Sequence, residues 1–208
     1  MAYPTRNAAA EAMIRDAAAF YGHGWMLGTS GNLSVRLGEG RFLVTASGRD
    51  KSRLNPEDFL ERAVDGEQPE APRGVEPSAE TEIHEVIYRH LPQAGAVYHV
   101  HEPHAAFCSQ RDDDIGSTIM AGAEMIKGLG IWDEDPRVRV PILANHFDVS
   151  KIATDIGVYL SATKPRVPGV NIQSHGIYAW GETPFEAKRH VETFAYLFRY
   201  SWELGNGA

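Results

Sequence analysis

The strand-like segments of this chain are short, and a tight turn joins two of them, which restricts how a sheet can be assembled. NLSVRL and RFLVTAS are rich in apolar and β-branched residues, and Gly38-Glu39-Gly40 separates them. A short connection that contains glycine is typical of a β-hairpin. The sequence therefore favours a mixed or mainly antiparallel sheet with helices on its faces over a doubly wound parallel sheet.

Helical periodicity or helix-start signals mark the segments between the strands. Thr5 and Ser78 are expected to be N-caps, while Thr183, Pro184 and Glu186 have the spacing of a capping box. We expect no internal boundary, and hence one α/β domain over residues 1–208. The expected helices cover residues 5–20, 77–92, 103–111, 148–162 and the segment after residue 183, whereas 55–76 is expected to be a surface excursion and 117–130 is ambiguous.

The composition and net charge of the chain argue against several classes of protein. The chain has 208 residues, 43% of them hydrophobic, which is enough for a sizeable core. Its net charge of −8 argues against a nucleic-acid-binding surface, and no apolar run approaches the roughly 20 residues of a membrane span. The N-terminal segment contains acidic residues and does not resemble a signal peptide. The single cysteine, Cys108, cannot form an internal disulfide, so we expect a cytoplasmic protein.

The segment YHVHEPH, residues 98–104, contains the strongest chemical signal. Side chains at positions i and i+2 of a strand point to the same face, so His99 and His101 would present two imidazoles side by side. The alternative is a pair of surface histidines, but the preceding strand AGAVYHV is apolar and favours coordination. Nine histidines against one cysteine predict nitrogen and oxygen ligands rather than thiolates. His104 is a weaker candidate ligand.

A third ligand must come from a distant part of the sequence. His175 follows a strand, and Gly176 would let the backbone turn tightly beside it. Three protein ligands and an open position are the arrangement of a catalytic zinc site. His146, in the loop ANHFD, competes for this role. The remaining histidines are expected to be structural or to lie at the surface: His23, His84, His90 and His190.

Two carboxylates are candidates for acid–base chemistry. Glu80 lies at the start of a predicted helix, where it could simply interact with the helix dipole, with His84 one turn later. Glu124 lies among small and apolar residues that could raise its pKa, although it could also be a solvated loop residue.

Three short loops could together bind an anion. Serine hydroxyls, glycine backbone N–H groups and a helix N-terminus are suitable donors for phosphate, although such loops are mostly plain turns. The sequence contains neither a P-loop nor a GxGxxG motif, so we expect no nucleotide cofactor. The candidate anion-binding residues are Asn32, Ser47, Gly48, Lys51 and Ser78.

These motifs, taken in order, are similar to the class II aldolase/epimerase superfamily over nearly the whole chain. The resemblance is carried by GTSGNLSVR, TASGRDKSRL, PSAETEIH, GAVYHVHEPHA and HGIYAWGETPFEAKRHVETFAYLF. It implies a three-layer α/β/α domain around a mainly antiparallel sheet, usually a homotetramer with sites near subunit contacts. It also implies one Zn²⁺ per subunit and a phosphorylated sugar substrate. The implied zinc ligands are His99, His101 and His175, and the implied phosphate contacts are Asn32, Ser47, Gly48 and Ser78, with Lys51 as an addition.

The branch within the superfamily depends on the two glutamates. EMIKG followed by HGIYAWG most resembles a dehydratase branch of methionine salvage, a group of hydro-lyases acting on a phosphorylated ketopentose with a methylthio end. There the acid–base residue would be Glu124, close to the open side of the metal. In sugar-phosphate aldolases or epimerases the base would instead match Glu80. A non-catalytic, adducin-like interaction module is a third alternative, which the three intact metal ligands argue against.

Overall fold

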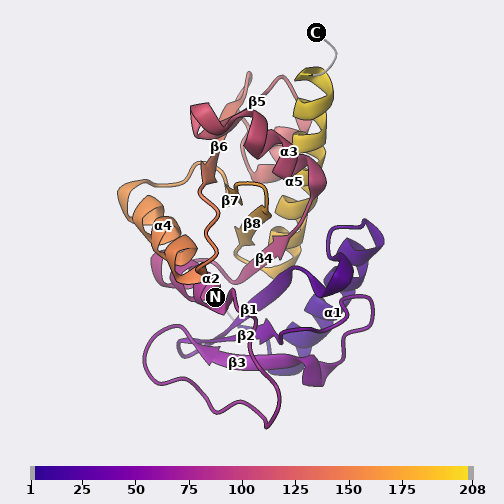
Figure 1. The fold of residues 1–208 in the computed structure, drawn as a ribbon, viewed down its shortest axis with the longest axis vertical. Helices are drawn as coiled ribbons and strands as arrows, with labels where there is room; N and C mark the ends of the chain where they lie inside the picture. Colours follow the sequence, from indigo (N-terminus) through magenta and orange to yellow (C-terminus); the bar gives the residue numbers. More distant parts are fainter. Residues whose placement is uncertain (1–2, 206–208) are drawn as a thin grey trace.

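An eight-stranded sheet runs through the middle of the molecule (Figure 1). Its strands are β1 (Asn32–Gly38), β2 (Arg41–Thr45), β3 (Phe59–Ala63), β4 (Ala96–Val100), β5 (Ser117–Ala121), β6 (Arg137–Leu143), β7 (Gly169–Ile172) and β8 (Gly176–Gly181). In the computed structural model, which describes residues 3–205, the order is β3-β2-β1-β4-β8-β7-β6-β5. Every neighbouring pair is antiparallel except β6 and β7. The predicted, mainly antiparallel sheet is confirmed.

Helices cover both faces of this sheet and give the predicted three layers. They are α1 (Arg6–Gly22), α2 (Thr81–His90), α3 (Pro103–Arg111), α4 (Val149–Ala162) and α5 (Pro184–Gly205), with 3-10 turns η1 (Leu27–Thr29), η2 (Pro56–Asp58), η3 (Asp113–Ile115) and η4 (Glu124–Leu129). Buried side chains of α1, α3 and α5 share one core, and those of α2 and α4 share the other. Figure 1 shows α4 and α5 on opposite sides of the sheet.

The two cores explain why the central strands are buried throughout. In β1, Leu33 and Val35 face the core of α1 and α5, whereas in β4 Val97 faces the core of α2 and α4. Because both faces are covered, all five residues of β4 are buried. Within residues 3–205, no helix is long and apolar enough to cross a membrane.

Local signals predicted several element boundaries correctly. The Thr5 hydroxyl accepts a hydrogen bond from the Ala8 N–H at 3.3 Å, as expected of an N-cap. The Thr183 hydroxyl accepts from the Glu186 N–H at 3.2 Å at the start of α5. The hairpin of β1 and β2 also forms as predicted.

The predicted start of α2 is wrong. Ser78 is not the N-cap, because the helix begins at Thr81 and Glu80 occupies the capping position. Pro77 forms an isolated antiparallel bridge with Ala46, which keeps this segment extended and delays the helix. The Ser78 hydroxyl instead accepts from the Glu80 N–H at 3.3 Å.

Two segments contain more structure than the sequence indicated. The expected surface excursion 55–76 includes η2 and β3, and β3 forms an edge of the sheet by pairing with β2. Its sequence, FLERA, is too short to show a clear alternation of apolar and polar residues. The ambiguous segment 117–130 resolves into β5 and η4.

The turn between β7 and β8 is tight, but Gly176 is not the residue that makes it so. The left-handed conformation belongs to Ser174, with φ of 53°. Gly176 serves a different purpose, because a Cβ there would lie 2.2 Å from the Val100 carbonyl oxygen on β4. The absence of a side chain therefore permits the close approach of β8 to β4.

We predict that a substitution at Gly176 destabilises the fold, whereas a substitution at Ser174 has little effect on stability. Gly176→Ala should lower the free energy of unfolding by about 1–3 kcal/mol, because its methyl group overlaps backbone that cannot move freely. Ser174→Gly should stay within about 1 kcal/mol of the parent, since it relieves a left-handed residue while losing a side-chain contact. Urea unfolding followed by circular dichroism measures both values, and equal losses would contradict this account of the turn.

Candidate metal centre and anion pocket

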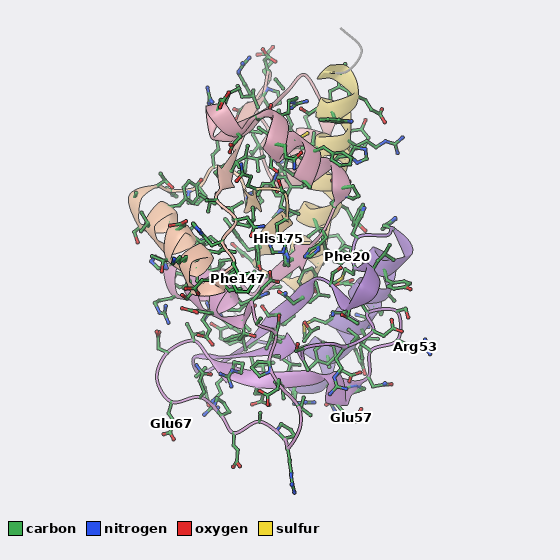
Figure 2. All side chains as sticks on the ribbon, in the orientation of Figure 1. Phe20, Arg53, Glu57, Glu67, Phe147 and His175 are labelled. Carbon is green, nitrogen blue, oxygen red and sulfur yellow. The ribbon has the colours of Figure 1, made fainter. Side chains whose placement is uncertain are left out.

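Three imidazoles converge where β4 ends and the β7–β8 turn begins. The Nε2 atoms of His101 and His99 are 3.0 Å apart, and those of His175 and His101 are 3.1 Å apart. All three side chains belong to one cluster whose ligand atoms lie within 4.8 Å of one another. Figure 2 shows His175 near the middle of the molecule, away from both ends of its long axis. The structure thus brings together the three histidines that the sequence selected.

The strand pairings explain this convergence. His99 is opposite Asn32 of β1 on one side and Tyr178 of β8 on the other. The ring of Tyr178 stacks on that of His99, with centroids 4.1 Å apart. The Nδ1 atom of His99 lies 3.1 Å from the Ile177 carbonyl oxygen and donates to it, so Nε2 carries the free lone pair. A backbone acceptor of this kind fixes the tautomer and orientation of a metal-ligating histidine.

Burial keeps the rings of His99 and His101 neutral, which favours the binding of a cation. Burial lowers the pKa of His99 well below its usual value, and it lowers that of His101 to about 4. Both rings are therefore neutral at neutral pH, as coordination requires. Three imidazole nitrogens that lie within 4.8 Å of one another fit a divalent ion such as Zn²⁺.

Glu80 lies against two of these rings, those of His99 and His175. Its Oε1 is 3.2 Å from His175 Nε2, and its Oε2 is 3.5 Å from His99 Nε2. The Asn32 amide donates to Oε2 at 2.5 Å. Burial raises the pKa of Glu80, but its interactions with His99, His175 and Asn32 together lower it further, so the net direction is downward. Glu80 thus lies at the histidine cluster and at the capping position of α2, where its side chain forms no capping hydrogen bond.

A pocket of about 380 Å³ opens beside this cluster. It contains all five residues that the sequence selected for anion binding, although the chain segments that carry them are far apart in the sequence. The lining residues are Thr29, Ser30, Gly31, Asn32, Ala46, Ser47, Gly48, Lys51, Ser78, Ala79, Glu80, His101 and Val149. The pocket therefore combines one member of the histidine cluster, His101, with the Glu80 carboxylate and several hydrogen-bond donors.

Lys51 connects two of the loops that line this pocket. Its ammonium group donates to the carbonyl oxygens of Thr29 at 2.7 Å and Arg49 at 3.0 Å. Burial lowers the pKa of Lys51 to about 8. Lys51 thus supplies positive charge to the pocket while it holds the two loops together.

Glu124 lies in a different part of the chain's surface. Its side chain is 83% exposed and pairs with Lys127 at 2.5 Å, so the predicted apolar surroundings are wrong. The turn η4 buries Ile126 and Leu129 and leaves the carboxylate outside. Glu124 lines a pocket with Lys127 and the acidic segment 133–135, and that pocket shares no residue with the histidine pocket.

The other histidines have other partners. His146, the competing ligand, pairs with Asp155 at 2.9 Å and is not part of the cluster. His104 pairs with Glu102, which caps α3. His84 is fully buried and contacts Asn32, a role that the sequence analysis missed. Its spacing of four residues from Glu80 was the available signal.

Comparisons with known proteins identify the family of this chain. A model of the class II aldolase and adducin N-terminal domain family matches residues 11–202. The chain is 43% identical over 191 residues to a methylthioribulose-1-phosphate dehydratase of Microcystis aeruginosa, covering 90% of this chain and 92% of that protein. The corresponding protein of Geobacillus kaustophilus is 40% identical over 178 residues, with coverage of 85% and 82%.

Solved structures with the same fold include an l-fuculose-1-phosphate aldolase from Thermus thermophilus. Its TM-score is 0.75 at 25% identity, and the match covers 98% of this chain and 100% of that one. YgbL from Klebsiella pneumoniae, described as a putative aldolase/epimerase/decarboxylase, has a TM-score of 0.81 at 23% identity, with coverage of 98% and 92%. The chain therefore belongs to the class II aldolase and adducin N-terminal domain family.

Proposed function

We propose that this chain is a zinc-dependent methylthioribulose-1-phosphate dehydratase, a hydro-lyase of methionine salvage that works in the cytoplasm. The observation that carries the proposal is the 43% identity over 90% of the chain to a protein of that name. The three-histidine cluster beside an anion pocket supplies the chemistry that such a reaction needs.

The metal ligands in this proposal are His99, His101 and His175. These three residues would hold a divalent ion, and the ion would supply Lewis-acid polarisation of the substrate ketone. The zinc assignment is supported by an all-nitrogen cluster with no thiolate among its members.

The phosphate end of the substrate lies in the pocket next to the cluster. The Ser47 and Ser78 hydroxyls and the backbone at Gly48 supply neutral donors, Lys51 supplies charge, and Asn32, in the wall of the same pocket, donates to the Ser78 hydroxyl. These groups come from three separate segments that converge in one cavity, which is the arrangement a phosphorylated sugar requires. Binding of the phosphate fixes the position of the carbon atoms that react.

Glu124 is the proposed acid–base residue. It takes the proton from C3, next to the ketone, and returns a proton to the C4 hydroxyl as that group leaves as water. Tautomerisation of the resulting enol gives 2,3-diketo-5-methylthiopentyl 1-phosphate. Because Glu124 is exposed and lines another pocket of its own chain, it must reach the histidines of a neighbouring copy in a homotetramer.

One observation favours a second candidate, a sugar-phosphate aldolase. Glu80 lies against the histidines of its own chain, at 3.2 Å from His175 Nε2, and could act as a base without any neighbour. The same metal and phosphate sites would then support cleavage of the C3–C4 bond. The fold likeness to an l-fuculose-1-phosphate aldolase agrees with either reaction.

A side-by-side assay decides between these candidates. Purified protein loaded with zinc is incubated with methylthioribulose 1-phosphate and, separately, with fuculose 1-phosphate. We expect loss of water from the first and no cleavage of the second. Aldol cleavage of fuculose 1-phosphate without dehydration of the other substrate would overturn the proposed function.

We predict that the histidine cluster accounts for the bound metal. His99→Ala/His101→Ala should lower the zinc content to near zero, because a single remaining imidazole cannot hold the ion. His146→Ala is the matched control, since that ring pairs with Asp155 outside the cluster. Elemental analysis of the dialysed proteins measures both, and undiminished zinc in the double variant would exclude this site.

The two glutamates should behave differently when each is replaced by glutamine. Glu124→Gln should lower kcat by about 10²-fold while zinc content stays constant, because it removes only the proton acceptor. Glu80→Gln should lower zinc content, since it removes a negative charge next to His99 and His175, and should cost less activity per bound zinc than Glu124→Gln. Rates normalised to metal content test this, and the reverse ranking would favour the aldolase.

A further inference from the structure

A row of polar side chains lies between α2 and β1, in what is otherwise the apolar core of α2 and α4. Glu80, at the capping position of α2, and His84 and Tyr88 within the helix are four residues apart, and on the strand Asn32 and Ser34 are two apart. Four residues of helix rise about 6 Å and two residues of strand about 6.7 Å, so the two series stay in register. Each helix side chain therefore meets a strand partner.

Hydrogen bonds join these five side chains into one continuous chain. The Tyr88 hydroxyl lies 2.8 Å from Ser34 Oγ, which lies 2.7 Å from His84 Nδ1. On the other side of the ring, His84 Nε2 contacts Asn32 Oδ1. The Asn32 amide then donates to Glu80 Oε2 at 2.5 Å. This series of hydrogen bonds thus ends at the Glu80 carboxylate, which faces the histidine cluster.

The hydrogen bonds of this series all run in one direction, from Tyr88 towards Glu80. The Asn32 NH₂ group donates to Glu80 Oε2, and the Asn32 carbonyl oxygen faces His84 Nε2. Burial lowers the pKa of His84 to about 4, so its ring is neutral, with one donor and one acceptor. An amide oxygen can only accept, so Nε2 donates to Asn32 and Nδ1 is left as an acceptor. The Ser34 hydroxyl donates to Nδ1 at 2.7 Å, in preference to the Val97 carbonyl oxygen at 3.3 Å, and accepts from Tyr88.

Burial makes this arrangement rigid. His84 and Ser34 are fully buried, and Tyr88 is 1% exposed. Water cannot replace a missing partner there, so each hydrogen bond fixes the orientation of the next group. The ring of His84 also packs edge-on against Tyr178, with centroids 5.9 Å apart.

We propose that His84 is a positioning residue that holds the Asn32 amide in the orientation serving both halves of the site. From that orientation, Asn32 Nδ2 donates to Glu80 at the histidine cluster and to the Ser78 hydroxyl, at 3.3 Å, in the anion pocket. Without the Nε2 donor, the amide can turn over and present its oxygen to the Glu80 carboxylate, which repels it. Through Asn32, His84 thus orients both Glu80 beside the histidine cluster and Ser78 in the anion pocket.

The tautomer of His84 tests this inference without any reaction. Long-range ¹H–¹⁵N spectra of the zinc-loaded protein at neutral pH should show a neutral ring with the proton on Nε2 and a bare Nδ1. A ring protonated on Nδ1, or on both nitrogens, would reverse the chain of donors and overturn the proposal. Ser34→Ala should then allow the other tautomer, because it removes the donor to Nδ1.

Two substitutions at position 84 separate positioning from packing. Glutamine can place an amide N–H near the former Nε2, whereas asparagine reaches only as far as Nδ1. His84→Asn should therefore lower kcat/KM by about 10-fold or more, as loss of a supporting hydrogen bond does at metal sites, and His84→Gln should recover most of that loss. Tyr88→Phe is the stability control, since it removes a hydrogen bond two steps from Asn32. Equal losses in all three variants would show that the role is merely structural.

The kinetic comparison rests on the proposed function, but a binding measurement does not. Titration of zinc-loaded protein with inorganic phosphate should show weaker binding in His84→Asn by at least about threefold, a loss of roughly 0.7 kcal/mol, with His84→Gln close to the parent. Unchanged phosphate affinity in His84→Asn, together with an unchanged tautomer in Ser34→Ala, would overturn the positioning role. A protein that binds phosphate as expected but does not dehydrate the substrate would refute the proposed function alone.

Discussion

The pairing of β4 with β1 on one side and β8 on the other determines where every group of the site lies. It puts His99 between Asn32 and Tyr178 and brings the β7–β8 turn, with His175, to the end of the strand that carries His101. The absence of a Cβ at Gly176 permits this approach. A shift in register by one residue would turn His99 to the other face of the sheet and separate the ligands.

This arrangement removes polar groups from water, which is unfavourable unless those groups are hydrogen-bonded. His84 and Asn32 are buried and the Glu80 side chain is only 15% exposed, so an unpaired polar atom there would destabilise the fold. Each is hydrogen-bonded to a neighbour, and the matched spacings of α2 and β1 make those contacts simultaneous. The same contacts that satisfy buried groups therefore orient the groups that face the pocket.

Short-range periodicity was enough to predict part of the site. The i, i+2 spacing of His99 and His101 indicated a shared face, and the structure has His101 Nε2 3.0 Å from His99 Nε2. Small polar loops at Asn32, Ser47 and Ser78 were selected for their donors, and they line one pocket. In each case the residue types and their local spacing carried the information, and the resemblance to a family supplied the third ligand.

What could not be predicted depends on contacts between distant segments. The bridge between Ala46 and Pro77 precedes the delayed start of α2, and Glu80, at the capping position, contacts His99 and His175. The buried role of His84 needs β1 beside α2, which no local pattern specifies. The sequence around Glu124 looked apolar, but η4 places its side chain in solvent.

X-ray absorption at the zinc edge tests the central claim most directly, because it reports the ligands themselves. The account predicts three imidazole nitrogens at roughly 2.0–2.1 Å, with oxygen atoms completing the shell and one nitrogen lost in His175→Ala. Sulfur at about 2.3 Å would implicate Cys108 instead. That result, or a shell unchanged in His175→Ala, would contradict the account.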